Sequence, residues 1–177
     1  MALRMSGLLL VSCMLAGCGT HESIRHYEVV APIATTSAFV KDVPEGWLPG
    51  QLVISRGGVQ VRRDAAYEVR DGDKRAEITV TSLPAEGNSN LANVNRWRQQ
   101  LQLEPMSESQ LQQAVTKIQM GDLAADYVQL AGAQESILGV MALRQGTVWF
   151  IKLQGHSDLA KREQARFEQF VKSLPLK

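Results

Sequence analysis

The chain has 177 residues, of which 45% are hydrophobic and 21% are charged, with 19 basic and 18 acidic side chains. This apolar content is enough for the core of one ordinary domain, and it excludes an intrinsically disordered chain and a polytopic membrane protein. The balanced charge lacks the basic excess that is typical of nucleic-acid binding, so we expect no nucleic-acid partner. Both cysteines, Cys13 and Cys18, lie near the amino terminus.

Residues 1–17 are predicted to be an export signal. They combine one positive charge, Arg4, with an apolar run over residues 8–16. The run is too short to span a bilayer, which takes about 20 apolar residues, and the pattern is typical of a secretory signal peptide. Small residues follow the run and lead directly into Cys18, in the tetrapeptide Leu15-Ala16-Gly17-Cys18.

This tetrapeptide resembles the lipobox of bacterial lipoproteins. In that family the cysteine sulfur takes a diacylglycerol thioether, the signal is cut just before the cysteine, and the new amine is acylated. The resemblance implies lipidation of Cys18 and a membrane anchor made of several acyl chains, such as palmitate, because each buried methylene contributes about 0.8 kcal/mol. An ordinary cleaved signal peptide with an incidental cysteine is the alternative.

The residues after Cys18 bear on location and on domain organisation. Gly19 is not the aspartate that favours inner-membrane retention in Gram-negative lipoproteins, so the resemblance implies the periplasmic face of the outer membrane in such an organism. Cleavage removes Arg4 and no acid, so the basic side chains fall by one from 19 and the mature chain has 18 of each sign. Residues 18–36 are expected to form a tether, although 27–30 could pair as an edge strand. Residues 37–177 are predicted to be a single domain.

The first half of this domain is predicted to contain a hairpin and two helices. Residues 39–47 indicate a strand end and a Pro/Gly turn, and 60–70 alternate moderately. A hairpin is expected over 65–82, around the turn Asp71-Gly72-Asp73. Helical periodicity covers 90–103, and Ser107 begins a short helix because it forms a capping box with Gln110.

Four strands and a helix are expected in the second half. Residues 115–120 and 124–130 flank one turn, and 135–143 and 147–153 flank another. The last two strands are apolar on both faces, which is typical of strands covered on both sides. Ser157 is expected to cap a final helix whose charged residues, Glu163 among them, face solvent. Its buried stripe is Leu159, Ala160, Phe167, Phe170, Val171 and Leu174.

Short turns between consecutive strands predict an antiparallel sheet, and helices packed on such a sheet make an α+β domain. Residues 39–47, the central hairpin and the segment 149–174 resemble the Mog1/PsbP-like fold, an α/β/α sandwich. Residues 93–101 are also similar to a motif in a group of bacterial lipoproteins of unknown function. Members of the wider fold are usually accessory or adaptor proteins, so the resemblance implies no catalytic residues and no cofactor.

Motifs for catalysis or metal binding are not evident in the sequence. There is no GxSxG, P-loop, GxGxxG or HExxH pattern. His21 and His26 lie in the tether and His156 lies at a helix start, so we predict no metal site, with weak binding by His21 and His26 as the alternative. Two carboxylate pairs consist mostly of turn residues: Asp71 with Asp73, and Asp122 with Asp126. We therefore expect that the protein is not an enzyme, with an unrecognised hydrolase as the alternative.

The cluster Asn95, Arg96, Trp97 and Arg98 is the candidate binding site. Arginine supplies planar bidentate donors for carboxylate or phosphate, and tryptophan supplies a large amphipathic surface. Together they suit an acidic partner or a peptide. The alternative is structural: Trp97 belongs to the core, and an arginine and an asparagine tie the helix to the loop 84–89.

The sequence therefore predicts a lipid-anchored, non-catalytic protein of the cell envelope. Its single domain is expected to bind a partner protein or peptide. A second hypothesis is a small-ligand carrier with a pocket between sheet and helix near Trp97.

Overall fold

A computed structural model describes residue 40 and residues 42–176. The predicted signal peptide over 1–17, the lipidation of Cys18 and the tether over 18–36 lie outside the described residues, as do His21 and His26. Among the described helices, none is long and apolar enough to cross a bilayer.

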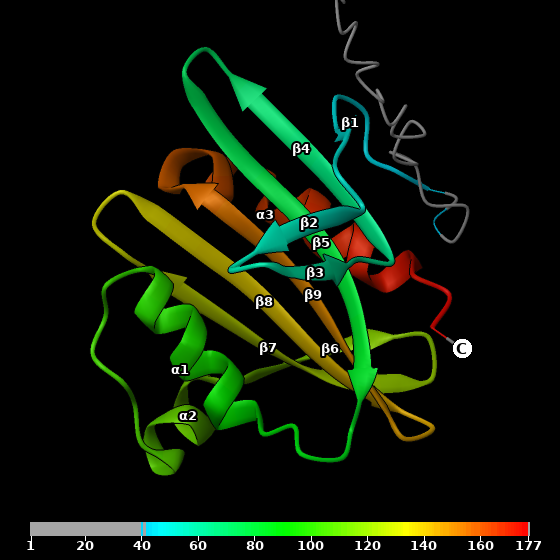
Figure 1. Ribbon diagram of the computed structural model, residues 1–177, viewed down its shortest axis with the longest axis vertical. Helices are drawn as coiled ribbons and strands as arrows, with labels where there is room; N and C mark the ends of the chain where they lie inside the picture. Colours follow the sequence, from blue (N-terminus) through cyan, green and yellow to red (C-terminus); the bar gives the residue numbers. More distant parts are fainter. Residues whose placement is uncertain (1–39, 41, 177) are drawn as a thin grey trace, which may run out of the picture. The chain divides into compact units, whose positions relative to one another are not determined.

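The described residues form an antiparallel seven-stranded sheet and a separate two-stranded hairpin (Figure 1). The sheet order is β1 (Leu48–Pro49), β4 (Ala65–Asp71), β5 (Lys74–Pro84), β9 (Thr147–His156), β8 (Glu135–Arg144), β7 (Leu123–Ala131) and β6 (Thr116–Met120). The hairpin pairs β2 (Val53–Arg56) with β3 (Val59–Arg62), and the helices are α1 (Asn90–Gln100), α2 (Glu108–Ala114) and α3 (Ser157–Ser173). Because every strand pair is antiparallel, the predicted α+β class is confirmed.

Helices cover both faces of the sheet, in the expected α/β/α order (Figure 1). On one face, Phe167 and Phe170 of α3 pack into a core with residues such as Ile78 and Ile151. On the other face, α1 and α2 share a second core with β7, β8 and β9. The interiors of β8 and β9 are buried from both sides, as their apolar sequences predict.

The predicted helix starts are largely confirmed, and one predicted helix end is wrong. Ser89 caps α1 by accepting from the backbone N–H of Ala92, and Ser107 and Gln110 form the capping box of α2. Helix α1 was expected to reach residue 103, but it ends at Gln100 because Gln102 adopts a φ of +57°. That left-handed residue turns the chain out of the helix.

The hairpin β2–β3 was not predicted, whereas the hairpin over 65–82 is confirmed as β4–β5. The alternating stretch 60–70 is divided between β3 and β4, because the chain bends at Arg63 and Asp64. Backbone N–H of Asp64 donates to the carbonyl of Val80 (2.8 Å), and its carboxylate accepts from the backbone N–H of Ser82 (2.7 Å). These contacts fix the bend over β5.

Two expectations about α3 are wrong. His156, not Ser157, caps α3, with its Nδ1 accepting from the backbone N–H of Asp158 (3.2 Å). Glu163 was expected to face solvent, yet it is 1% exposed because it falls four residues after Leu159, within the apolar stripe. Trp47 donates from its indole nitrogen to this buried Glu163, at Oε2 (3.0 Å).

The turn expected within 39–47 is confirmed, since the backbone N–H of Trp47 donates to the carbonyl of Pro44 (3.2 Å). The strand end expected before this turn lies partly outside the described residues, and residues 42–44 form no strand.

Candidate functional site

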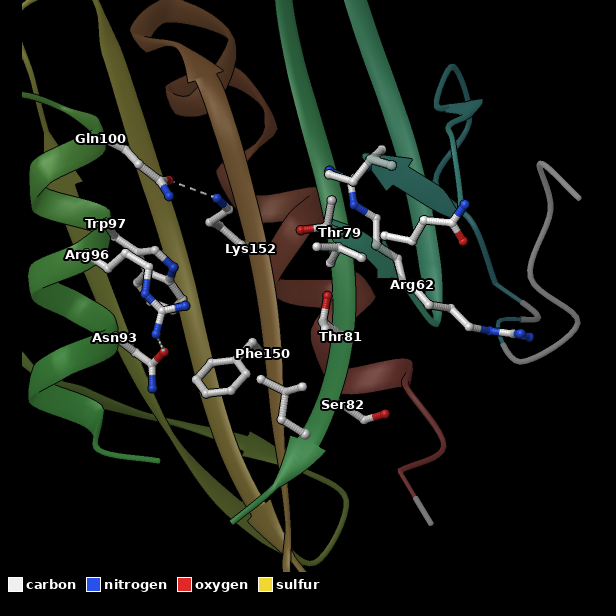
Figure 2. A pocket seen from close by; sticks show the side chains of 15 residues that line it. Arg62, Thr79, Thr81, Ser82, Asn93, Arg96, Trp97, Gln100, Phe150 and Lys152 are labelled. Carbon is white, nitrogen blue, oxygen red and sulfur yellow. Dashed lines mark hydrogen bonds between the residues drawn. The ribbon is translucent and has the colours of Figure 1, made fainter. Parts of the chain in front are cut away.

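A cleft of about 680 Å³ opens on the α1 side of the sheet (Figure 2). Helix α1 forms one wall, the β2–β3 hairpin forms the other, and β5 and β9 form the floor. The strand register sets the floor, because Thr79 lies opposite Lys152 and Thr81 lies opposite Phe150. The cleft is thus the part of this sheet face that lies between α1 and the hairpin.

Trp97 fixes the α1 wall. Its side chain is 6% exposed, and a β-carbon on Gly139 of β8 would lie 2.2 Å from its Cζ3 atom. Its ring meets that of Phe150 edge-on, with centroids 6.2 Å apart and an interplanar angle of 89°. Trp97 is therefore part of the core and also lines the cleft, so the binding and core interpretations of this residue are compatible.

Hydroxyl groups line the floor. Thr79 is 7% exposed, and its side chain has no hydrogen bond to another residue within the described part of the chain. Thr81 is half-buried, two residues along the same face of β5. Figure 2 shows both side chains projecting from β5 into the space beside α1. A hydroxyl that lines a cleft without a protein partner can both donate and accept, so Thr79 is suited to a hydrogen bond with a ligand.

Positive charge surrounds this floor. Arg62, Arg63, Arg96 and Lys152 line the cleft, and no aspartate or glutamate among the described residues does so. The charge of Arg63 is compensated by Glu77, which it contacts through two hydrogen bonds (2.8 and 3.1 Å). The cleft is consequently basic although the whole chain is nearly neutral.

Arg96 and Lys152 hold their positions through neutral amides. Arg96 Nη2 donates to Asn93 Oδ1 (2.6 Å), and Lys152 Nζ donates to Gln100 Oε1 (3.1 Å) and Gln154 Oε1 (2.8 Å). Figure 2 draws two of these bonds, the one within α1 and the one that joins α1 to β9. Amide partners orient a cation without neutralising it, so Arg96 remains suited to an anion, and Lys152 is held facing the same space.

The structure separates the four residues of the predicted binding cluster. Asn95 donates to the carbonyl of Met106 (3.0 Å) and accepts from its backbone N–H (2.8 Å), and Arg98 Nε donates to the carbonyl of Glu104 (2.6 Å). These two side chains hold the connection between α1 and α2 and do not line the cleft. Arg96 and Trp97 do line it.

Asn95 and Arg98 have the structural role that the sequence offered as an alternative, but the loop that they hold is not the predicted one. The sequence suggested that an arginine and an asparagine tie α1 to the loop 84–89, but Asn95 and Arg98 tie it to residues 104–106 instead. The contact with the earlier loop comes from Asn93, whose Nδ2 donates to the carbonyl of Ser89 (2.9 Å).

Several cleft residues were missed by reasoning from sequence: Arg62, Thr79, Thr81 and Lys152. One signal was available, because the alternation of β5 places Thr79 and Thr81 on the face opposite Ile78 and Val80. A polar face on a central strand indicates that the face is incompletely covered. The opposite wall could not be predicted, since the β2–β3 hairpin was itself missed.

Three of the four candidate carboxylates are engaged in separate ion pairs, and Asp73 is exposed at the β4–β5 turn. Asp71 pairs with Arg162 (2.7 Å) and Asp122 pairs with Arg144 (2.8 Å), while Asp126 contacts Lys117. The hydrogen bond from Arg144 lowers the pKa of Asp122. Within the described residues, no group of three or more histidine, cysteine, aspartate or glutamate side chains is placed to hold a metal.

Glu163 is the exceptional carboxylate, because it is buried at the opposite face of the sheet. Its carboxylate accepts hydrogen bonds from the Trp47 indole and from Arg162 Nε (2.9 Å). It also lies 3.5 Å from Arg166 Nη1. Burial alone raises the pKa of Glu163, but the hydrogen bonds from Trp47 and Arg162 and the charges of the two arginines outweigh it, so the pKa is lowered. This group fastens the segment before β1 onto α3.

Comparison with family models and with curated proteins gave no match. Three solved structures resemble the chain. A Pseudomonas aeruginosa protein of unknown function, PA94, has 11% identity and a TM-score of 0.40, with 71% of this chain and 96% of that chain covered. Cyanobacterial PsbP from Synechocystis sp. PCC 6803 has 10% identity and a TM-score of 0.44, with 76% and 84% covered.

The third structure is LpqN of Mycobacterium tuberculosis, which is involved in cell envelope biogenesis. It has 16% identity and a TM-score of 0.36, with 75% of this chain and 77% of that chain covered. At these identities and TM-scores the likeness carries no inference about activity. The α+β class rests on the sheet and helices themselves, and membership of the Mog1/PsbP-like family stays a prediction.

Proposed function

We propose that this is a lipid-anchored, non-catalytic protein of the cell envelope whose α+β domain binds a partner protein or peptide. The site is the cleft between α1 and the β2–β3 hairpin. The observation that carries the proposal is the cleft itself: it combines an aromatic wall, threonine hydroxyls on its floor and basic side chains, with no aspartate or glutamate of the described residues lining it. Concave sites with a few convergent polar groups are where ligands usually bind.

The predicted lipid anchor would keep this binding site close to a membrane. Lipidation of Cys18 would hold the domain at a membrane through its acyl chains, and residues 18–36 would separate the domain from the lipid surface. A tether of that length lets the cleft reach partners in the surrounding compartment.

A small-ligand carrier is the second candidate, and one observation favours it. The cleft lies between the sheet and α1 beside Trp97, and its volume of about 680 Å³ suits a small organic molecule. Because the cleft is open to solvent, we place a polypeptide first. An open trench can receive one stretch of a longer chain, whereas carriers usually enclose most of their ligand's surface.

Site-specific photo-crosslinking in the producing cells tests the proposal. A benzoylphenylalanine at Gln60, an exposed residue of the cleft wall, should give a discrete adduct of higher mass. The same probe at Lys172, exposed on α3, is the matched control and should not give this adduct.

A cleft-filling variant makes the test specific. Thr81→Trp places a large side chain in the cleft, so it should abolish the Gln60 adduct while the thermal unfolding curve stays cooperative. The proposal fails if the adduct is equally strong from Lys172, or if it persists when the cleft is filled. Adducts only with small metabolites, detected by mass spectrometry, would favour the carrier instead.

A further inference from the structure

The chemistry of the cleft narrows the class of partner, if the proposed binding function holds. Arg96 is exposed and donates one hydrogen bond within the described residues, to the neutral Asn93, whereas a guanidinium has five N–H donors. It has no acidic partner within 4.0 Å among the described residues. The wall of α1 thus presents a fork of donors whose geometry matches a carboxylate.

Lys152 and Thr79 extend this anion-binding corner onto the floor. Their positions are directly opposite in the β5–β9 register, so the ammonium and the hydroxyl face the same space beside α1. The bond from Lys152 to Gln100 fixes the lysine toward α1. A carboxylate placed here would accept from two cations and from a hydroxyl that is otherwise without a partner.

Arg62 contributes differently. It lies on the hairpin at the rim of the cleft, and Figure 2 shows its side chain extending away from α1. Its guanidinium is exposed and forms no ion pair with a described residue. A charge at the rim accelerates the encounter with an acidic partner more than it stabilises the final complex.

Apolar groups adjoin the anion-binding corner. Phe150 and Trp97 form an aromatic surface, and Leu83, which is 39% exposed, continues it along β5. Polar amides of Asn93 and Gln100 alternate with this surface along the α1 wall. An acyl chain would need a continuous apolar channel, whereas a peptide backbone requires this mixture of donors, acceptors and apolar contacts.

We propose that the cleft recognises an acidic peptide segment in which a glutamate or aspartate is next to an apolar side chain. The carboxylate binds Arg96, Lys152 and Thr79, and the apolar neighbour packs on Phe150 and Leu83. Arg62 assists the approach of the segment. Anionic lipid is the competing source of negative charge, and the experiment separates the two.

The test measures fluorescence anisotropy of a labelled peptide that alternates glutamate with leucine, added to the mature chain carrying Cys18→Ser. A peptide with glutamine in place of each glutamate is the matched probe. The acidic peptide should bind, and its affinity should fall as salt rises. Charged hydrogen bonds contribute about 1.5–3 kcal/mol, so the glutamine peptide should bind roughly tenfold or more weakly.

Three variants locate the contact. Arg96→Gln should raise the dissociation constant of the acidic peptide about tenfold, mainly through faster release. Arg62→Gln should chiefly slow association. Lys172→Gln, on the exposed surface of α3, is the control and should leave both rates unchanged. Circular dichroism melting curves establish that each variant is folded.

Equal binding of the acidic and glutamine peptides would overturn this inference, as would full affinity in Arg96→Gln. Displacement of the acidic peptide by phosphatidylglycerol vesicles, with tighter vesicle binding that depends on Arg96, would assign the cleft to lipid instead. If the Gln60 crosslink forms while the acidic peptide fails to bind, the proposed function stands and only the ligand chemistry is wrong. If both fail, the binding function fails as well.

Discussion

Trp97 of α1 lies so close to Gly139 of β8 that a β-carbon on the glycine would be 2.2 Å from the indole Cζ3 atom. Real β-carbons essentially never approach another heavy atom so closely, so α1 can pack at this distance only over a glycine. The contact sets the height of the helix above the sheet, and with it the width of the cleft.

Gly139→Ala should therefore destabilise the domain and displace α1. We expect the free energy of unfolding to fall by about 1–3 kcal/mol, which is typical of overpacking in a dense core. Urea denaturation measures it. In the matched cycle, Trp97→Leu makes room for the new methyl group, so the double variant should be more stable than the sum of the single effects predicts. Strictly additive effects would show that the two residues are not coupled.

Glu163→Gln should remove a pH-dependent part of the stability. The pKa of Glu163 is lowered from 4.5 in the folded protein, so its ionised form stabilises the fold above that pH, and this contribution is lost as the pH falls through the depressed pKa. At neutral pH the variant should lose about 2 kcal/mol, because Trp47 and two half-exposed arginines lose a charged acceptor.

Urea denaturation between pH 3 and about pH 7, a window below and above the ordinary glutamate pKa, measures this effect. The difference between wild type and Glu163→Gln should shrink as the pH is lowered below 4.5. Glu86→Gln, at an exposed loop position, is the control and should show no such pattern. A constant difference across the range would rule out a stabilising charge at Glu163.

The residues of the predicted binding cluster should divide into two classes. Asn95→Ala removes two hydrogen bonds to Met106 and should lower the free energy of unfolding by about 1–3 kcal/mol with little change in ligand affinity. Arg96→Gln should weaken ligand binding with little change in the free energy of unfolding, since its side chain is exposed and lies in the cleft. Thermal unfolding and peptide binding, measured on both variants, check the division. Loss of affinity in a fully folded Asn95→Ala protein would contradict it.

Cys18→Ser should abolish acylation and release the protein from the membrane fraction. Serine cannot form the thioether that the lipobox resemblance implies, and without acyl chains a formally neutral mature chain has no basic excess to hold it at anionic lipid. Labelling with a fatty-acid analogue and fractionation of the cells measure both effects. Cys13→Ser, within the predicted signal peptide, is the control and should be acylated normally.

Local patterns predicted the fold better than they predicted the site. The capping box of Ser107, the turn at Asp71-Gly72-Asp73 and the apolar runs of β8 and β9 each arise from neighbouring residues, so they are visible in sequence. The burial of Glu163 was missed because its partner Trp47 is 116 residues away. A charge in an apolar stripe is normally exposed, and here this distant hydrogen bond acts together with the ion pairs to Arg162 and Arg166 to stabilise the buried carboxylate.

The cleft illustrates the same limit. Arg96 and Trp97 were identified because they are adjacent on one helix, but the other half of the site comes from β3, β5 and β9. Thr79 and Lys152 are 73 positions apart in the numbering and are joined only by strand register. The register of a sheet is a long-range property, so sequence could indicate a polar face on β5 without identifying what lies opposite.

The most direct measurement is a ¹H–¹⁵N NMR titration of the mature Cys18→Ser chain with the peptide that alternates glutamate with leucine. We predict saturable shifts at the backbone amides of Thr79, Thr81 and Lys152 and at the indole N–H of Trp97, with the indole of Trp47 on the opposite face unchanged. The same titration of Arg96→Gln should give much weaker binding. Shifts confined to α3 and Trp47, or none at the cleft at saturating peptide, would contradict the assignment of the cleft as the binding site.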